Sequence, residues 1–199
     1  MFVATSSRLG RLFTLALLAL LTAPAQASWT LDNGSSRLSF VMTKNHHIGE
    51  VSRFYNVLGG VSDNGKVLLR VDMDSLRTGV LLQDQRLHKE LFTVSSFPYA
   101  DIKATLDLTP ITNLAPGAQM ELVLPLTLRI QKVEQDFMAD LLVTRLDEHR
   151  FQVVTQAPLV LDASTFELTA RIDSLRQLAG LQQVSLSVPV SAVLIFIRN

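Results

Sequence analysis

The chain contains 199 residues, with 18 Lys and Arg against 18 Asp and Glu, and it has no cysteine. Balanced charge without a basic stripe argues against a nucleic-acid partner, and the missing cysteine excludes disulfides, iron–sulfur clusters and cysteine-bound zinc. The length is sufficient for one domain with an apolar core.

The first 27 residues have the pattern of a secretory signal peptide. Arg8 and Arg11 form a basic start, and Leu12–Leu21 is an apolar stretch too short to span a bilayer as a helix. Ala25-Gln26-Ala27 then matches a cleavage site. We expect cleavage after Ala27, export to the periplasm and a single mature domain over residues 28–199.

Alternation of apolar and polar residues recurs along the mature chain and predicts β-strands. It is clearest over residues 121–131, where every even position is Leu or Ile. Asp63-Asn64-Gly65 predicts a tight hairpin, because Asn-Gly readily adopts positive φ. The other predicted strands cover residues 37–43, 49–54, 57–62, 66–73, 101–108, 136–146, 149–156 and 184–196.

Two stretches, residues 81–92 and 171–181, carry apolar residues three or four positions apart and predict short helices, the second ending near Gly180. Together, the predicted strands and helices indicate an all-β fold of about eight or nine antiparallel strands with one or two short helices. So many antiparallel strands usually close into a barrel or pack as a sandwich, because open edges invite aggregation. One Trp and two Tyr are too few for the aromatic girdles of a lipid-facing barrel, so we expect the apolar face to point inward.

The order of motifs resembles the YceI-like family of periplasmic proteins over essentially the whole mature chain. Gln83-Asp84-Gln85-Arg86 stands where that family usually has Arg-Asp-x-His, so polar residues differ where a ligand's head group is expected; Ser52 and Pro125 also depart from the family pattern. The segments that carry the resemblance are Trp29-Thr30-Leu31-Asp32, His47 with Gly49, Arg53-Phe54, Asp72–Leu76, Thr78-Gly79, Asp84, Leu91-Phe92 and Phe97-Pro98.

The resemblance implies an antiparallel eight-stranded, lipocalin-like barrel that encloses a deep apolar cavity, as in family members that bind polyisoprenoids and quinone-type lipids. We therefore expect a binding or carrier protein for such a ligand, not an enzyme. We assign no catalytic residue, no metal site and no cofactor other than a bound polyprenyl lipid or quinone.

Alternation and resemblance together place a set of mostly apolar side chains on the cavity wall, with His47 as a candidate hydrogen-bond partner for a head group. His46 and His47 are adjacent and would face opposite ways on a strand, which disfavours a metal site. Asp72 and Asp74 are interpreted as turn residues, and Asp84 as a first-turn helix acid. The candidate ligand-binding residues are Phe40, Met42, His47, Phe54, Leu69, Val71, Met73, Phe92, Ile102, Ala104, Leu124, Leu126, Leu128 and Phe137.

Two other functions stay open on the sequence. One is a filled barrel that acts as a scaffold or interaction protein without a ligand. The other is an enzyme that acts on an isoprenoid lipid, which would need clustered polar side chains inside the cavity. Besides an apolar small molecule, we expect transient contact with a membrane or a membrane protein; the oligomeric state stays open, with a dimer among the options.

Export is tested by expressing the full chain in a Gram-negative host. Protein released by osmotic shock should begin at Ser28, because the small residues Ala25 and Ala27 direct signal-peptide cleavage to that bond. N-terminal sequencing checks this, with Ala25→Arg as the variant expected to block processing. An uncleaved wild-type chain in washed membranes would contradict the prediction.

Overall fold

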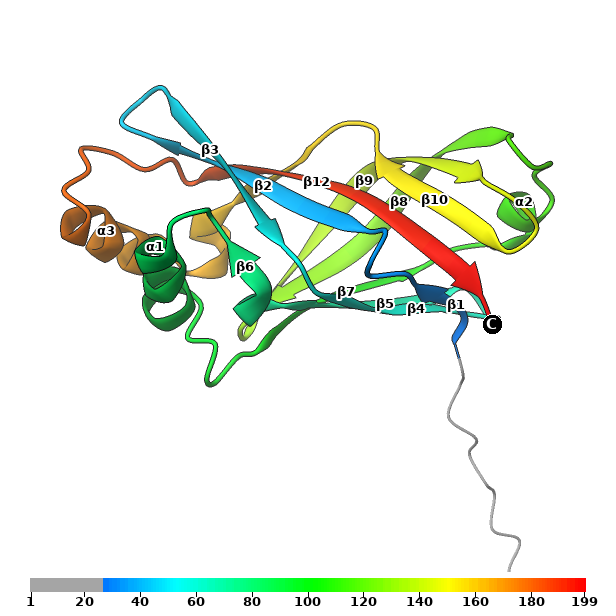
Figure 1. Cartoon of the computed structure of the whole chain (residues 1–199), viewed down its shortest axis with the longest axis horizontal. Coiled ribbons are helices and arrows are strands. Elements are labelled where there is room, and N and C mark those ends of the chain that lie inside the picture. Colours follow the sequence, from blue (N-terminus) through cyan, green and yellow to red (C-terminus); the bar gives the residue numbers. More distant parts are fainter. Residues whose placement is uncertain (1–26) are drawn as a thin grey trace, which may run out of the picture.

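The computed structural model describes residues 27–199, so the predicted signal peptide lies outside the described residues except for Ala27 (Figure 1). Its strands are β1 (Ala27–Leu31), β2 (Arg37–Lys44), β3 (Ile48–Phe54), β4 (Val57–Ser62), β5 (Lys66–Asp72), β6 (Leu76–Arg77), β7 (Tyr99–Thr105), β8 (Gln119–Ile130), β9 (Val133–Arg145), β10 (Arg150–Thr155), β11 (Leu159–Asp162) and β12 (Ser187–Arg198). Its helices are α1 (Leu81–Arg86), α2 (Thr109–Thr112) and α3 (Thr169–Leu178), with a π-helical turn η2 (Leu87–Leu91) and 3-10 turns η1 (Met73–Ser75) and η3 (Ala163–Phe166).

The strands form one antiparallel sheet that closes on itself. The hydrogen-bonded order runs from β1 through β4, β5, β7, β8, β9 and β10 to β12, and β12 pairs again with β1. The other four strands continue this sheet. Strands β2 and β11 pair with β12, β3 pairs with β2, and β6 pairs with β3. The result is the predicted eight-stranded antiparallel barrel.

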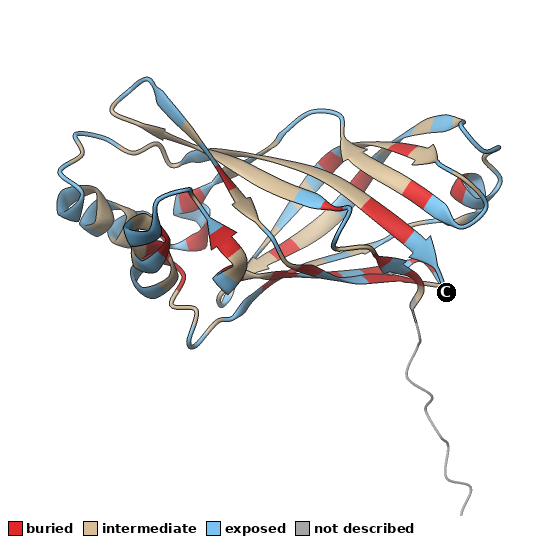
Figure 2. Cartoon of the chain, in the orientation of Figure 1, coloured by how far each residue is buried: buried red, intermediate tan, exposed pale blue. Residues whose placement is uncertain are grey.

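Alternation along the strands decides which side chains enter the barrel. In β5, Val67, Leu69 and Val71 are buried while Leu68 and Arg70 between them are exposed. Figure 2 shows buried segments in red between exposed or intermediate ones on several strands, whereas most of β2 and β12 is intermediate. Because side chains of a strand point to opposite faces in turn, the apolar half of each strand lines the interior.

The two ends of the barrel differ in structure. Figure 1 shows α1 and α3 at one end and α2 at the other. At the α2 end, Trp29 and Phe151 pack edge to face with ring centroids 4.8 Å apart. Arg145 Nη1 donates hydrogen bonds to the carbonyls of Thr112 (3.0 Å) and Leu114 (2.6 Å), and these bonds fix α2 over that opening.

Both predicted helical stretches are confirmed: α1 with η2 covers residues 81–91, and α3 ends just before Gly180, whose φ is +64°. Asp72 caps η1 by accepting from the Asp74 backbone N–H at 3.0 Å, as its interpretation as a turn residue predicts. The helix α2 is an additional element; it is four residues long and begins at Thr109-Pro110, too short to produce a helical period in the sequence.

The predicted hairpin at Asn64-Gly65 connects β4 and β5. Gly65 has a φ of +75°, and its N–H donates to the Ser62 carbonyl at 2.9 Å. A Cβ atom at Gly65 would lie 1.9 Å from the Leu106 carbonyl oxygen. Only glycine therefore fits, both for its backbone angle and for its contact with the segment that follows β7.

Gly65→Ala should lower the free energy of unfolding by roughly 3 kcal/mol, because backbone strain and a clash with a carbonyl oxygen add together. Gly117 is the matched control: its φ is +82°, but nothing lies within 4 Å of the position of a Cβ. Gly117→Ala should cost only about 1 kcal/mol from the backbone angle alone. Urea unfolding measures both, and equal losses would contradict this account of the hairpin.

Candidate ligand-binding cavity

The barrel interior contains two adjoining cavities. The helix-end cavity, beside α1 and α3, has a volume of about 480 Å³. The α2-end cavity has a volume of about 170 Å³. They share five wall residues and so lie next to each other inside the barrel, and the larger one is of the size usual for small-molecule sites. The shared residues are Leu38, Ile102, Leu126, Leu159 and Val190.

The α2-end cavity is lined almost wholly by carbon. Its aromatic wall consists of Trp29, Phe151 and Phe196, and aliphatic side chains from the barrel strands complete it. Thr155 is the one polar residue of this lining, and the exposed surface inside the cavity is apolar. A polar group placed here would lose its hydrogen bonds to water without replacement.

The helix-end cavity is apolar in its depth and polar at its border. Most of its lining is aliphatic or aromatic, including side chains from α3 and η3 that close it from the side. Its polar lining residues come from α1, α3, β2 and the segment before β12. They are Lys44, Gln83, Arg86, Arg176 and Ser185.

Partly buried hydrogen bonds hold the helices at this end of the barrel. The Leu91 carbonyl accepts from Gln131 Nε2 at 3.0 Å and from Arg171 Nη1 at 2.9 Å, so the β8–β9 turn and α3 meet at η2. Asp84, in the first turn of α1, is buried and accepts from both the backbone N–H and Oγ1 of Thr78 at 2.7 Å. Its predicted role as a helix acid is thus a structural one, which anchors α1 beside the cavity.

Several inward-facing side chains are only half-buried, although the sheet around them is closed. Leu38, Phe40 and Met42 of β2 are examples, as are Ile102 and Leu126 in the middle of the barrel. In a close-packed interior such residues would be buried, because protein cores leave few voids larger than a water molecule. Their residual exposure faces the cavity space.

The structure brings most of the predicted site residues to the cavity walls, although contact with a ligand remains a prediction. The helix-end cavity is lined by Phe40, Met42, Phe54, Val71, Met73, Phe92, Ile102, Leu126 and Leu128. The α2-end cavity is lined by Leu69, Ile102, Ala104, Leu124 and Leu126.

Two predicted residues lie elsewhere. Phe137 lines neither cavity; it is partly buried, stacks on Phe166 of η3 at 6.3 Å between ring centroids and packs against the core. His47 is exposed in the β2–β3 turn and lines neither cavity, because Asn45 and His46 adopt positive φ and end the strand before it.

Sequence reasoning missed wall residues on β12, η3 and α3, such as Val190, Phe166 and Ile172. The apolar spacing within residues 171–181 was a usable signal, since the apolar face of a short helix must cover something.

Among residues 27–199, no group of three or more His, Asp or Glu side chains is placed to hold a metal ion. No described helix is long and apolar enough to cross a bilayer.

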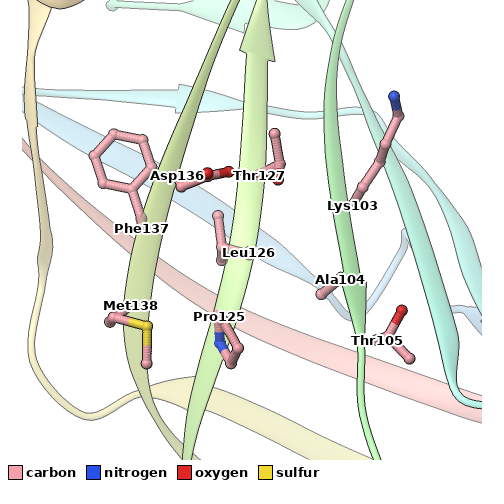
Figure 3. A pocket seen from close by; sticks show the side chains of 9 residues that line it. All are labelled: Lys103, Ala104, Thr105, Pro125, Leu126, Thr127, Asp136, Phe137 and Met138. Carbon is pink, nitrogen blue, oxygen red and sulfur yellow. Dashed lines mark hydrogen bonds between the residues drawn. The ribbon is translucent and has the colours of Figure 1, made fainter.

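A further hollow, of about 540 Å³, lies on the outer face of β7, β8 and β9 (Figure 3). Its border is formed by outward-facing residues, among them Lys103, Thr127, Asp136 and Met138, and Thr127 Oγ1 donates to Asp136 at 2.6 Å. This hollow is open to water and partly polar, so an apolar chain resting in it would stay largely hydrated. The barrel interior is the better candidate site.

Comparison with known proteins agrees with this geometry. The YceI-like domain family matches residues 29–196. A polyisoprenoid binding domain from Saccharophagus degradans, implicated in plant cell wall breakdown, is 33% identical, with a TM-score of 0.85 over 87% of this chain and 100% of that one. Burkholderia cenocepacia BcnA shares the fold at 16% identity, with a TM-score of 0.63 over 83% of this chain and 98% of its own. Curated protein sequences gave no match.

Proposed function

The chain belongs to the YceI-like family, and we propose that it is a periplasmic binding or carrier protein that holds a long apolar ligand, such as a polyisoprenoid or a quinone-type lipid, inside its barrel. The observation that carries the proposal is the pair of adjoining, mainly apolar cavities inside the barrel. The polyisoprenoid binding domain of Saccharophagus degradans supports the ligand class. The signal-peptide pattern of the sequence supports export.

Burial of hydrocarbon alone accounts for useful affinity. Each buried CH₂ group contributes about 0.8 kcal/mol, so a five-carbon isoprene unit contributes about 3–4 kcal/mol before the costs of association. A few units in the two cavities would then be enough for micromolar binding. No specific polar contact is needed along the apolar chain.

Two observations support binding over the alternative functions. A filled scaffold barrel would bury Leu38, Phe40 and Met42, which instead are only partly buried and line the helix-end cavity. An enzyme would need a general base, for which His, Asp and Glu are the usual choices. The polar side chains along the described cavity walls are Lys44, Gln83, Thr155, Arg86, Arg176 and Ser185.

Leu126→Asp tests the proposal. Leu126 lines both cavities, so a carboxylate there would oppose an apolar ligand but could be hydrated once the ligand leaves. The variant should fold with a melting temperature close to that of wild type and should lose at least about tenfold of its bound lipid. Organic extraction of the purified protein followed by mass spectrometry measures the lipid, and thermal melts of the same sample measure folding.

Val123→Asp is the matched control, since Val123 lies on the same strand with an exposed side chain. It should retain the wild-type lipid content. A Leu126→Asp protein that melts far below wild type, together with a wild type that yields no lipid, would indicate a filled barrel and end the carrier proposal.

We also propose that the helix end contacts a membrane surface while the lipid is exchanged. Val80, Leu81, Leu82 and Leu178 are all more than half exposed there, and three of them line the cavity border. An apolar ligand would pass this border on its way between bilayer and barrel. Exposed leucines at that point can enter the membrane interface and shorten the path of the ligand through water.

Leu81→Ser combined with Leu82→Ser should slow transfer of a fluorescent polyprenyl probe from phospholipid vesicles to the protein severalfold, with little change in the amount bound at equilibrium. Stopped-flow fluorescence measures the transfer rate. Val123→Ser removes an equally exposed apolar residue from the barrel side and should leave that rate unchanged. Wild-type kinetics in the double variant would refute the membrane contact.

A further inference from the structure

The charged side chains at the border of the helix-end cavity are of one sign. Lys44, Arg86 and Arg176 line it, and no Asp or Glu does. The two other polar residues of this lining, Gln83 and Ser185, are neutral. The rest of the cavity is carbon, so this border is where the polar end of an amphiphile would lie.

Two of these three cations are already paired. Lys44 Nζ lies 2.5 Å from Glu50 Oε2 and 3.0 Å from Gln83 Oε1. Arg176 Nε lies 2.8 Å from Asp173 Oδ1, and its Nη1 donates to the Leu181 carbonyl at 2.9 Å. Their charges are balanced by carboxylates that stand outside the cavity wall.

Arg86 is different. It is half-buried at the end of α1, and in the described part of the chain it forms no ion pair. Its one hydrogen bond runs from Nη1 to the Leu178 carbonyl at 3.4 Å, a length at which such bonds are weak. A guanidinium carries five N–H donors, so most of its capacity beside the cavity is unused.

We propose that Arg86 binds the anionic head group of the ligand, and that the natural ligand is therefore an acidic amphiphile, a long-chain carboxylate or an isoprenyl phosphate. This inference rests on the proposed function and names the class of lipid that the barrel takes. Carboxylate and phosphate share the feature that matters, paired anionic oxygens that match the donor geometry of a guanidinium. The apolar chain extends from there past Ile102 and Leu126 toward the α2 end.

A purely structural role for Arg86 makes a different prediction. If Arg86 only joins α1 to the end of α3 through Leu178, its loss should affect the binding of every ligand alike. If it binds an anion, its loss should affect acidic ligands selectively. The decisive quantity is thus the ratio of affinities for charged and neutral ligands with the same chain.

Geranylgeraniol, geranylgeranoic acid and geranylgeranyl phosphate provide this comparison, because they share one apolar chain and differ in the head group. Delipidated wild-type protein should bind at least one of the two anions about tenfold more tightly than the alcohol. Arg86→Gln should abolish that preference and leave the affinity for the alcohol unchanged, whereas Arg86→Lys should keep part of it. Competition against a fluorescent polyprenyl probe measures all three affinities.

Lys89→Gln is the matched control, since Lys89 is on the adjacent η2, highly exposed and outside the cavity lining. It should leave the preference intact. A preference for one anion over the other identifies the head group as phosphate or carboxylate. Equal wild-type affinity for alcohol and anions, or equal weakening of all three ligands in Arg86→Gln, would overturn the inference. Failure of wild type to bind any of the three would instead overturn the proposed function.

Discussion

Closure of the sheet through β12 is the constraint on which the rest of the structure depends. This strand hydrogen-bonds with β10 and β11 along one edge and with β1 and β2 along the other. Once the sheet is closed, every second side chain of each strand must point inward, and the number of strands sets the width of the interior. The inward residues of this chain are mainly Leu, Val, Ile and Ala, with few large aromatic side chains in the middle. These side chains line the barrel wall but do not fill the interior, which leaves the two cavities.

The cavity lining carries charged side chains at one end only. At the α2 end, Trp29 and Phe151 pack against each other and the lining is carbon. At the helix end, α1 and α3 border an opening that carries cations and exposed leucines. A ligand with one polar and one apolar end therefore has a preferred direction, its head at Arg86 and its tail toward Trp29. Specificity for the head group and affinity for the chain then come from different parts of the molecule.

Local patterns determined how much of this could be predicted. Strand alternation over residues 121–131 predicted β8, and the Asn64-Gly65 pair predicted the hairpin between β4 and β5, because both signals depend on neighbouring residues alone. The segment β11 was missed, since four residues after Pro158 are too few to show a period. His47 lies outside both cavity linings, because Asn45 and His46 adopt positive φ and end the strand before it, which strand alternation does not show. Whether the interior is hollow depends on how all strands meet, and the role of Arg86 depends on the approach of α1 to α3; neither is visible in a single segment.

Native mass spectrometry of protein released from the periplasm without detergent tests the central claim most directly. The account predicts a complex heavier than the mature chain by the mass of one apolar lipid, which is lost on collisional activation and identified in the organic extract. A bare chain, both from cells and after incubation with a polyprenyl ligand, would contradict it.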